Sequence, residues 1–559
     1  MPSKTKERFH IILIKPSRYD DEGYVIRWGW GIITSNSLAC LYSLTQDVFK
    51  KGFLGENVEP VIHTFDETVQ KIPVRKLCQS VRKRNEKAIA CMVGVQTNQY
   101  ARAVDLAIEF KAEGIPSMIG GFHVSGVMAM LPDKGCGLQE AMDQGITLVA
   151  GEVEEKWGEL LEAAFRNRLE PAYDLIGDRP NLENVPGPIL PQSVMSRFFE
   201  RQTSFDAGRG CPFKCSFCTI IHIQGNTMRG RNADDIEKLV RTNFKNGSKH
   251  IFITDDNFAR HKDWEAIADR LIYLKEQKGI RCSLMIQTDV VAHKIPNFIE
   301  KMTRAGVRRV FIGMESVNPD NLKAAGKHQN QLKDYREMLQ KWRDHGALTC
   351  AGYIIGFPGD TYESIRRDVD FLKHELPLDL AEFFVMTPLP GSKDHQDLYL
   401  KKVPMAEDTN LYDSAHACNQ HPSMSNADWM RAYRDAWDSF YSREHLKTLL
   451  LRRKGPRRRL LFASLIWFCS SVFLTDVHPL LGGFWRIKNR RERRPGMPKE
   501  SFIPFYAKRI WVQTRYFFGF LALIFDIWLM TRSANHPKNQ DYQDVAITPE
   551  KKVIEASVL

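Results

Sequence analysis

Short apolar runs alternate with amphipathic stretches along the first 150 residues. Apolar runs of four to eight residues that end at Gly or a polar residue are typical of buried strands, and apolar positions every three or four residues are typical of helices. This order of elements predicts a parallel sheet whose ligand-binding loops, Gly94 to Gln99 and Gly120 to Gly126, lie at its carboxyl edge. We expect strands at 10–14, 60–65, 88–96 and 115–121, and helices at 35–49 and 103–114.

The pattern changes after residue 170. A stretch with five prolines predicts a linker over 171–198, because proline fits poorly inside regular elements. Beyond it, strand-like runs recur with helical stretches between them, which predicts a partial (β/α)6 barrel of the TIM type over 199–422. The barrel strands are expected at 203–208, 250–256, 282–289, 308–315, 347–356 and 381–389.

The C-terminal part, 423–533, predicts a mainly helical region that is basic and apolar. Its two apolar runs, 460–474 and 516–530, have 15 residues each, whereas a helix that crosses a bilayer needs about 20. We therefore expect interfacial or re-entrant insertion at a membrane surface, with two buried helices of a soluble domain as the alternative. The polar tail, 534–559, is expected to be disordered.

Charge is unevenly distributed. Between Lys447 and Arg532 there are 18 Lys and Arg against 4 Asp and Glu, a surplus of 14, whereas the whole chain carries +12. A basic segment in an otherwise nearly neutral chain indicates a local anionic partner, either lipid or nucleic acid. The N-terminus lacks the pattern of a cleavable signal peptide, so we expect a reducing, cytoplasmic setting in which grouped cysteines serve as ligands or nucleophiles.

Three cysteines are grouped: Cys211, Cys215 and Cys218 stand at the spacing CxxxCxxC in a Gly-rich segment directly after the first expected barrel strand. This spacing lets three thiolates converge on one inorganic centre. A structural zinc normally takes four protein ligands, whereas a four-iron cluster with three cysteines keeps one iron open. A Cys3His zinc site completed by His222 is the alternative.

Several motifs follow these cysteines in order: ITDDNF, FIGMES, GYIIGFPGDT and TPLPGS, each at the end of an expected strand. Together with the cysteines they resemble the radical S-adenosylmethionine (SAM) superfamily over about Thr203 to Gly391. The resemblance implies a [4Fe-4S] cluster on the cysteines and reductive cleavage of SAM to a 5′-deoxyadenosyl radical. It also implies SAM contacts from Asp255, Asp256, Gln287, Glu315, Gly352 and Gly356.

The N-terminal domain, 1–170, resembles the cobalamin-binding domains that precede such barrels. The matching positions are Gly94, Thr97, Gly120 and Gly121, with Gly151 further along the chain. The DxHxxG motif, whose His would be the lower cobalt ligand, is absent from this domain, and His123 does not replace it. Cobalamin bound without a protein ligand and a degenerate domain kept for packing or substrate binding remain as alternatives.

The resemblance implies a radical SAM enzyme that methylates, or otherwise modifies a C–H bond of, a small or lipid-like metabolite. A flavodoxin or ferredoxin is the expected electron donor. The enzymatic alternative is a methylthiotransferase acting on transfer RNA, but Cys40, Cys78, Cys91 and Cys136 form no obvious second cluster motif, and we expect no nucleic-acid partner. A non-catalytic iron–sulfur or zinc protein, acting as a redox sensor or scaffold, is the alternative from another class.

Overall fold

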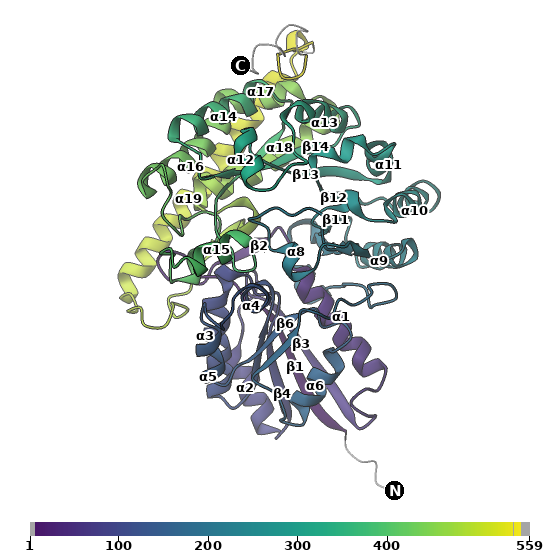
Figure 1. The fold of residues 1–559 in the computed structure, drawn as a ribbon, viewed down its shortest axis with the longest axis vertical. Helices are drawn as coiled ribbons and strands as arrows, with labels where there is room; N and C mark the ends of the chain where they lie inside the picture. The colour runs from purple at the N-terminus through teal and green to yellow at the C-terminus, as the bar shows by residue number, and fades with distance from the viewer. Residues whose placement is uncertain (1–5, 540, 549–559) are drawn as a thin grey trace. The chain divides into compact units, whose positions relative to one another are not determined.

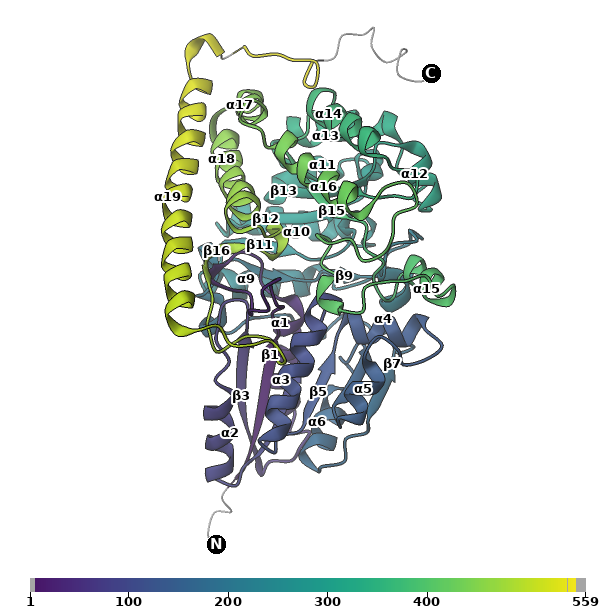
Figure 2. The ribbon, with the colours of Figure 1, turned by 90° about the vertical axis from the view of Figure 1, so that its left-hand side faces the viewer.

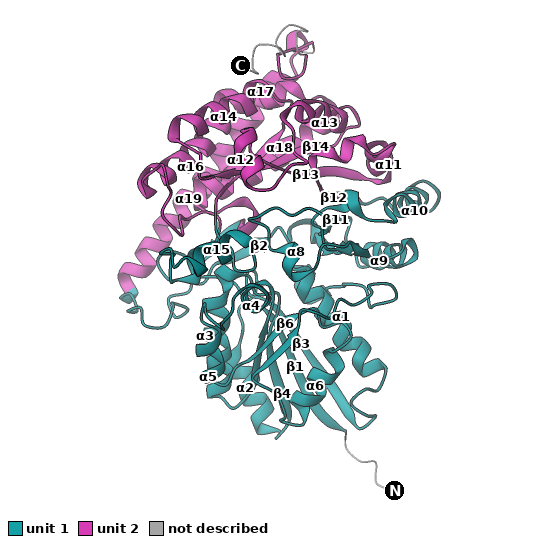
Figure 3. Ribbon diagram, in the orientation of Figure 1, with its two compact units in different colours: residues 1–282, 387–413, 484–502 teal, residues 283–386, 414–483, 503–559 magenta. Residues whose placement is uncertain are grey.

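The computed structural model describes residues 6–539 and 541–548. The chain forms two compact units, each built from three segments (Figure 3). Unit 1 comprises residues 1–282, 387–413 and 484–502, and unit 2 comprises residues 283–386, 414–483 and 503–559. The predicted domain boundaries are not those of the units, because unit 1 holds both the N-terminal domain and the first two strands of the expected barrel.

Unit 1 contains a parallel sheet in the order β3-β1-β4-β5-β6-β7 (Figure 1). The register runs from Phe9 opposite Lys87 to Ile14 opposite Met92, so apolar side chains of β1 and β4 alternate between the two faces. The strands are β1 Glu7–Lys15, β3 Val58–Asp66, β4 Lys87–Met92, β5 Ser117–Gly120, β6 Thr147–Gly151 and β7 Ala172–Leu175.

Two hydrophobic cores cover the two faces of this sheet. One core holds Ile12, Ile14 and the apolar faces of α2 to α5, and the other holds Ile11, Leu13 and the apolar faces of α1 and α6. The sheet is therefore buried on both sides, which explains its continuous apolar runs. The helices are α1 Asn36–Lys50, α2 Val74–Lys83, α3 Tyr100–Ala112, α4 Phe122–Met130, α5 Leu138–Asp143 and α6 Trp157–Phe165.

The second sheet consists of six parallel strands in chain order. In unit 1, β8 pairs with β11, and Phe205 lies opposite Ile253. In unit 2, β12, β13, β14 and β15 pair in this order. The predicted fold class, a parallel α/β sheet followed by a (β/α)6 unit, is confirmed. The strands are β8 Thr203–Phe205, β11 His250–Ile253, β12 Ser283–Thr288, β13 Val307–Glu315, β14 Leu348–Ile355 and β15 Leu380–Val385.

Helices alternate with these strands, as expected for the class. Unit 1 contributes α7 Gln192–Met195, α8 Ile220–Ile223, α9 Ala233–Lys245, α10 Trp264–Gln277 and α15 Lys393–Leu400. Unit 2 contributes α11 Phe298–Ala305, α12 Pro319–Ala324, α13 Leu332–Asp344 and α14 Tyr362–His374. Two further sheets have two strands each: β9 Gly208–Arg209 is antiparallel to β10 Arg229–Gly230, and β2 Arg27–Gly31 pairs with β16 Gly483–Ile487.

The C-terminal region is helical, as predicted, with α16 Asn426–Phe440, α17 Arg443–Arg452, α18 Gly455–Cys469 and α19 Phe502–Ala534. The two apolar runs differ in their surroundings. The first lies mostly in α18, where Leu461, Leu465 and Phe468 are buried, so one face of this helix packs within the protein. The second lies in α19, which is exposed along one side.

Two expectations are wrong in part. The predicted linker contains a strand, because Ala172–Leu175 extends the first sheet as β7, and it also contains α7. The tail is not disordered over 541–548, since Asp544 accepts a 2.7 Å hydrogen bond from Arg452 and Ala546 is buried. Specific contacts therefore determine the structure of these two segments, although the prolines of the first and the polarity of the second favour irregular structure. The end of the tail, 549–559, lies outside the described residues.

Candidate active site

The cysteine segment is closed at its base by a short antiparallel pair. Arg209 of β9 lies opposite Arg229 of β10, so residues 210–228 leave and re-enter the fold at the same place. Gly210 has φ 96°, and the space of a Cβ atom there is occupied by the carbonyl oxygen of Thr227 at 2.5 Å. Only glycine fits this turn, which explains the Gly-rich character of the segment.

Cys211, Cys215 and Cys218 are near neighbours within this segment. They form no disulfide, and the charges of Cys215 and Cys211 both raise the pKa of Cys218. Burial is the largest cause, and with these charges it raises that pKa to about 12. Thiols held this close and partly buried are matched to a cationic centre, which would favour their thiolate forms.

Two residues of the ITDDNF motif face the cysteines. Burial raises the pKa of Asp256 to about 7, and the charge of Asp256 raises the pKa of Cys211 and Cys218. The Asn257 side chain forms a hydrogen bond with Cys211, which lowers the pKa of that thiol, although burial raises it overall. The end of strand β11 therefore forms one wall of the cysteine site.

Within the described part of the chain, no three His, Cys, Asp or Glu side chains are grouped as ligands of one metal ion. A zinc site requires all its ligands around one point, whereas a cubane binds each thiolate to a different iron. The cluster on three thiolates and the Cys3His alternative with His222 therefore both stay predictions.

A cavity of about 460 Å³ lies next to this site, wholly within unit 1. On one side it is lined by Gly94, Gly120, Gly121 and other residues at the carboxyl edge of the first sheet. On the other side it is lined by Thr219 and further residues that follow Cys218. Asp256 also lines it. Additional lining residues include Asn36, Ser37, Ser125, Gly151, Trp157, Arg209, Ile220, Ile223 and Gln224.

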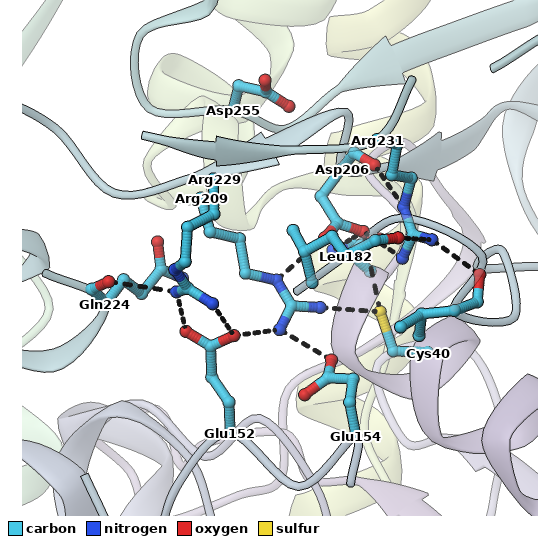
Figure 4. A network of polar contacts seen from close by, with 12 residues as sticks. Cys40, Glu152, Glu154, Leu182, Asp206, Arg209, Gln224, Arg229, Arg231 and Asp255 are labelled. Carbon is cyan, nitrogen blue, oxygen red and sulfur yellow. Dashed lines mark hydrogen bonds and ion pairs between the residues drawn. The ribbon is translucent and has the colours of Figure 1, made fainter. Parts of the chain in front are cut away.

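A buried polar network fixes the cysteine segment beside this cavity (Figure 4). Glu152, in the loop after β6, accepts a 2.7 Å hydrogen bond from Arg209 and also pairs with Arg229. Arg209 further pairs with Glu154 at 2.6 Å and with Asp206 at 2.8 Å. Because Arg209 and Arg229 stand at the two ends of the segment, Glu152 holds both ends against the first sheet.

Glu152→Gln is expected to loosen the cysteine segment. The substitution removes the charge that two partly buried guanidiniums share, and we expect a loss of about 2–3 kcal/mol of stability. Reconstituted protein should then lose iron to a chelator faster than the wild type. Glu155→Gln, at an exposed neighbouring position, is the matched control. Equal iron retention in both variants would show that Glu152 does not hold the segment.

The structure places the predicted residues of unit 1 in two groups. Gly94, Gly120, Gly121 and Asp256 line the cavity. Thr97 does not line it: its hydroxyl lies 3.3 Å from Nδ1 of His123. Asp255 is turned toward the strand β8 end, where it accepts a 2.7 Å hydrogen bond from the Ala207 amide, and burial raises its pKa to about 8.

The remaining predicted residues lie in unit 2. Gln287 is on β12, and Glu315 ends β13 with φ 65°, next to a register shift, where it pairs with Lys327. Such strained backbone is frequent at functional sites.

Packing requires glycine at one position in β14 and at the position directly after it. A Cβ atom on Gly352 would lie 2.6 Å from Phe311, and one on Gly356 would lie 2.2 Å from the indole nitrogen of Trp429. These side chains alone require glycine at both positions, so the SAM contacts of Gly352 and Gly356 stay predictions.

Sequence reasoning missed three polar residues. Asn257 stands in the ITDDNF motif, but its contact with Cys211 depends on the fold. Glu152 follows Gly151, but its two arginine partners are more than 50 positions away. Glu382, on β15, is buried next to Cys350, and burial raises its pKa to about 8. No local pattern indicates any of the three.

The family model described as the radical SAM superfamily matches residues 207–372, which include the cysteine segment and the strands β11 to β14. The chain contains a radical SAM domain over these residues. This radical SAM protein is an enzyme, and the cofactors of its family are a [4Fe-4S] cluster and S-adenosylmethionine.

Curated relatives of this radical SAM protein include methyltransferases. Bacteriochlorophyllide d C-8(2)-methyltransferase of Chlorobaculum tepidum is 25% identical over 346 residues, which cover 58% of this chain and 72% of the relative. Hopanoid C-2 methylase of Rhodopseudomonas palustris is 25% identical over 223 residues, which cover 38% of this chain and 41% of the relative.

Solved structures share the fold. The radical SAM methyltransferase TsrM of Kitasatospora setae has a TM-score of 0.58 and 14% identity, with 77% of this chain and 88% of that chain covered. The cobalamin-dependent SAM radical enzyme OxsB, with aqua-cobalamin bound, has a TM-score of 0.55 and 12% identity, with 95% of this chain and 80% of that chain covered.

Proposed function

We propose that this radical SAM enzyme is a cobalamin-dependent methyltransferase that acts on a small or lipid-like metabolite. The observation that carries the proposal is the cavity in unit 1, whose wall joins the carboxyl edge of the first sheet to the cysteine segment. A group bound there would contact both Gly120 and Thr219. The methyltransferase names of the relatives and the cobalamin in the OxsB structure support the same reading.

The lining of the cavity has both polar and apolar surfaces, as a corrinoid cofactor does. Its volume of about 460 Å³ is within the usual range of small-molecule sites. Polar groups of Asn36, Ser37 and Ser125 alternate there with apolar groups such as Val93 and Trp157, and four glycine backbones allow close approach. When bound, cobalamin supplies a cobalt centre that can carry a methyl group.

The protein does not offer a histidine to such a cobalt centre. None of the residues that line the cavity is a histidine. His123 is fully buried, its Nε2 lies 3.1 Å from the carbonyl oxygen of Cys136, and burial lowers its pKa to about 4. We infer that cobalamin binds without a histidine ligand, which agrees with the missing DxHxxG motif.

The chain's own residues have separate tasks in this proposal. Cys211, Cys215 and Cys218 would hold the cluster, which would supply an iron site for SAM and an electron for its cleavage. Asp256 and Asn257 lie beside Cys211, and the Arg209–Glu152 network keeps the cysteine segment in position. The electron that the reaction needs comes from a flavodoxin or ferredoxin, and the setting is reducing and cytoplasmic.

The methylthiotransferase alternative is less well supported. It requires three further cysteines that converge in the N-terminal domain. Cys78 lies in one hydrophobic core of the first sheet and Cys91 in the other, so the sheet separates them. These cysteines are therefore core residues.

Cobalamin binding tests the proposal. Ser37 lines the cavity, and Ser37→Trp would fill part of it. We expect the wild type to bind cobalamin in equilibrium dialysis and Ser37→Trp to bind it at least about tenfold more weakly, because the lost contacts and the steric overlap exceed about 1.4 kcal/mol. Ser37→Ala, which leaves the cavity open, should bind as the wild type does.

Iron content separates this test from a folding defect, since all three proteins should reconstitute the same cluster. Absence of cobalamin binding by the wild type would refute the cobalamin part of the proposal and would leave the radical SAM assignment in place.

A further inference from the structure

Helix α19 is the longest helix of the described chain and carries an exposed apolar stripe. Among the described residues it is the one helix that is long and apolar enough to cross a membrane. Only 17% of its most apolar 18-residue window is buried inside the protein. Its exposed large apolar residues recur at helical spacing and cover about 38 Å of its length. They include Ile503, Tyr506, Ile510, Phe517, Leu521, Phe525 and Trp528, with Trp511 and Phe518 beside them.

The opposite face of α19 is already occupied within unit 2 (Figure 2). Tyr516, Ile527 and Met530 are buried, and a Cβ atom on Gly519 would lie 3.1 Å from Leu474, at the end of the segment that continues α18. Near the C-terminal end of α19, Arg458 of α18 donates a hydrogen bond to Asn535. One face therefore packs on the protein and the other does not.

Charged groups border the stripe. Four cations, Lys508, Arg509, Arg515 and Arg532, stand on α19 with a single acid, Asp526. Asp526 accepts a 2.8 Å hydrogen bond from Arg443 of α17, so its charge is compensated within unit 2. The net positive charge of the helix disfavours a second copy of this chain against the same stripe and favours an anionic surface.

Two of these cations form cation–π contacts with tryptophan rings. The guanidinium of Arg515 lies 5.6 Å from the ring centroid of Trp511, and that of Arg532 lies 5.7 Å from that of Trp528. Tryptophan and arginine with apolar neighbours are characteristic of the interface between lipid headgroups and acyl chains. Such pairs occur both in the first half and near the end of α19.

We propose that α19 binds an anionic lipid bilayer in the plane of its surface, with the stripe from Ile503 to Trp528 inserted among the acyl chains. A spanning orientation would remove the contacts with α17 and α18 and would place Arg515, near the middle of the helix, in the hydrocarbon region. The in-plane orientation keeps these contacts and lets the cations reach the headgroups. This inference does not depend on the proposed methyl transfer.

Vesicle binding of the full chain tests the inference. We expect sedimentation with vesicles of equal parts phosphatidylglycerol and phosphatidylcholine, weaker binding to phosphatidylcholine alone, and release as salt rises from about 0.1 to 1 M. The triple variant Ile510→Ser, Phe518→Ser, Phe525→Ser should bind at least about tenfold more weakly. Its matched control is Leu400→Ser with Tyr273→Ser, two exposed apolar residues on other helices, which should bind as the wild type does.

Three outcomes would overturn the inference. Equal vesicle binding by the triple variant and the wild type, with unchanged circular dichroism, would place the lipid contact elsewhere. Resistance of vesicle-bound protein to alkaline carbonate would indicate a helix that spans the bilayer. No binding to either vesicle, together with a dimer that the triple variant dissociates, would assign the stripe to a second copy of the chain.

Discussion

Replacing Cys215 with alanine is expected to abolish formation of 5′-deoxyadenosine from S-adenosylmethionine. Cys215 is the middle cysteine of the segment and is buried, and its charge raises the pKa of both Cys211 and Cys218, so it stands next to both. Two thiolates are too few to hold a four-iron cluster that must keep one iron open. After anaerobic reconstitution with iron and sulfide, the variant should lack the cluster absorbance of the wild type.

A matched control is Cys282→Ala, because Cys282 is a partly exposed cysteine outside the segment. It should reconstitute the cluster and, with dithionite as the reductant, cleave SAM at the wild-type rate. Cleavage by Cys215→Ala would show that the cluster is held by other ligands. A wild type that carries the cluster and yet cleaves no SAM, even with cobalamin present, would favour the redox or scaffold alternative.

Replacing Asp379 with alanine is expected to cost about 3–5 kcal/mol of stability, the usual effect of removing one partner of a buried ion pair. Asp379 accepts a 2.6 Å hydrogen bond from Nε of Arg453, and the two side chains are 1% and 2% exposed. Without Asp379, the buried guanidinium of Arg453, between α17 and α18, has no compensating charge. The urea midpoint, followed by tryptophan fluorescence, measures the loss.

The same pair predicts a pH dependence. Burial raises the pKa of Asp379, but Arg453, Arg343 and the amide of Thr349 outweigh it, so the pKa lies below its ordinary value. A lowered pKa in the folded state gives stability that is present above the unfolded pKa of about 3.9 and is lost as pH falls through the folded pKa. Below about pH 4 the wild type should therefore lose its advantage over Asp379→Ala.

Two further variants test whether the loss of stability comes from the unpaired buried charge. Asp370→Ala removes an exposed carboxylate of α14 and should change stability by no more than about 0.5 kcal/mol. The double variant Asp379→Leu, Arg453→Met should regain most of the lost stability, because neither member of the pair is left charged and buried. If Asp379→Ala is as stable as Asp370→Ala, the pair does not hold α17 and α18 in place.

Much of the fold could be predicted because the spacing of apolar residues along the chain indicates the strands and helices. The run HIILI and the five runs that follow Thr203 are strands in the structure, since their apolar residues are continuous over the length of a buried parallel strand. The strand Ala172–Leu175 was not predictable in the same way. It is short and half-exposed, and it exists because the edge of β6 offers it backbone partners.

The candidate site, too, was predictable only in part. Cys211, Cys215 and Cys218 could be found because their ligand spacing lies within eight residues, and the motifs after them supported the family. The glycines at 94, 120 and 121 could be placed at one edge, because the carboxyl ends of parallel strands meet there. Glu152 and Glu382 could not be found, because partners distant in the chain define their surroundings.

The sequence by itself determined the elements, the class of fold and the cysteine segment, because periodicity and ligand spacing are properties of neighbouring residues. Only the tertiary structure decided which of two similar apolar runs is packed and which is exposed. The run in α18 has a sheet and helices to cover it, whereas α19 has a partner on one face alone. Burial depends on the surface that another part of the chain provides, and no local pattern contains that surface.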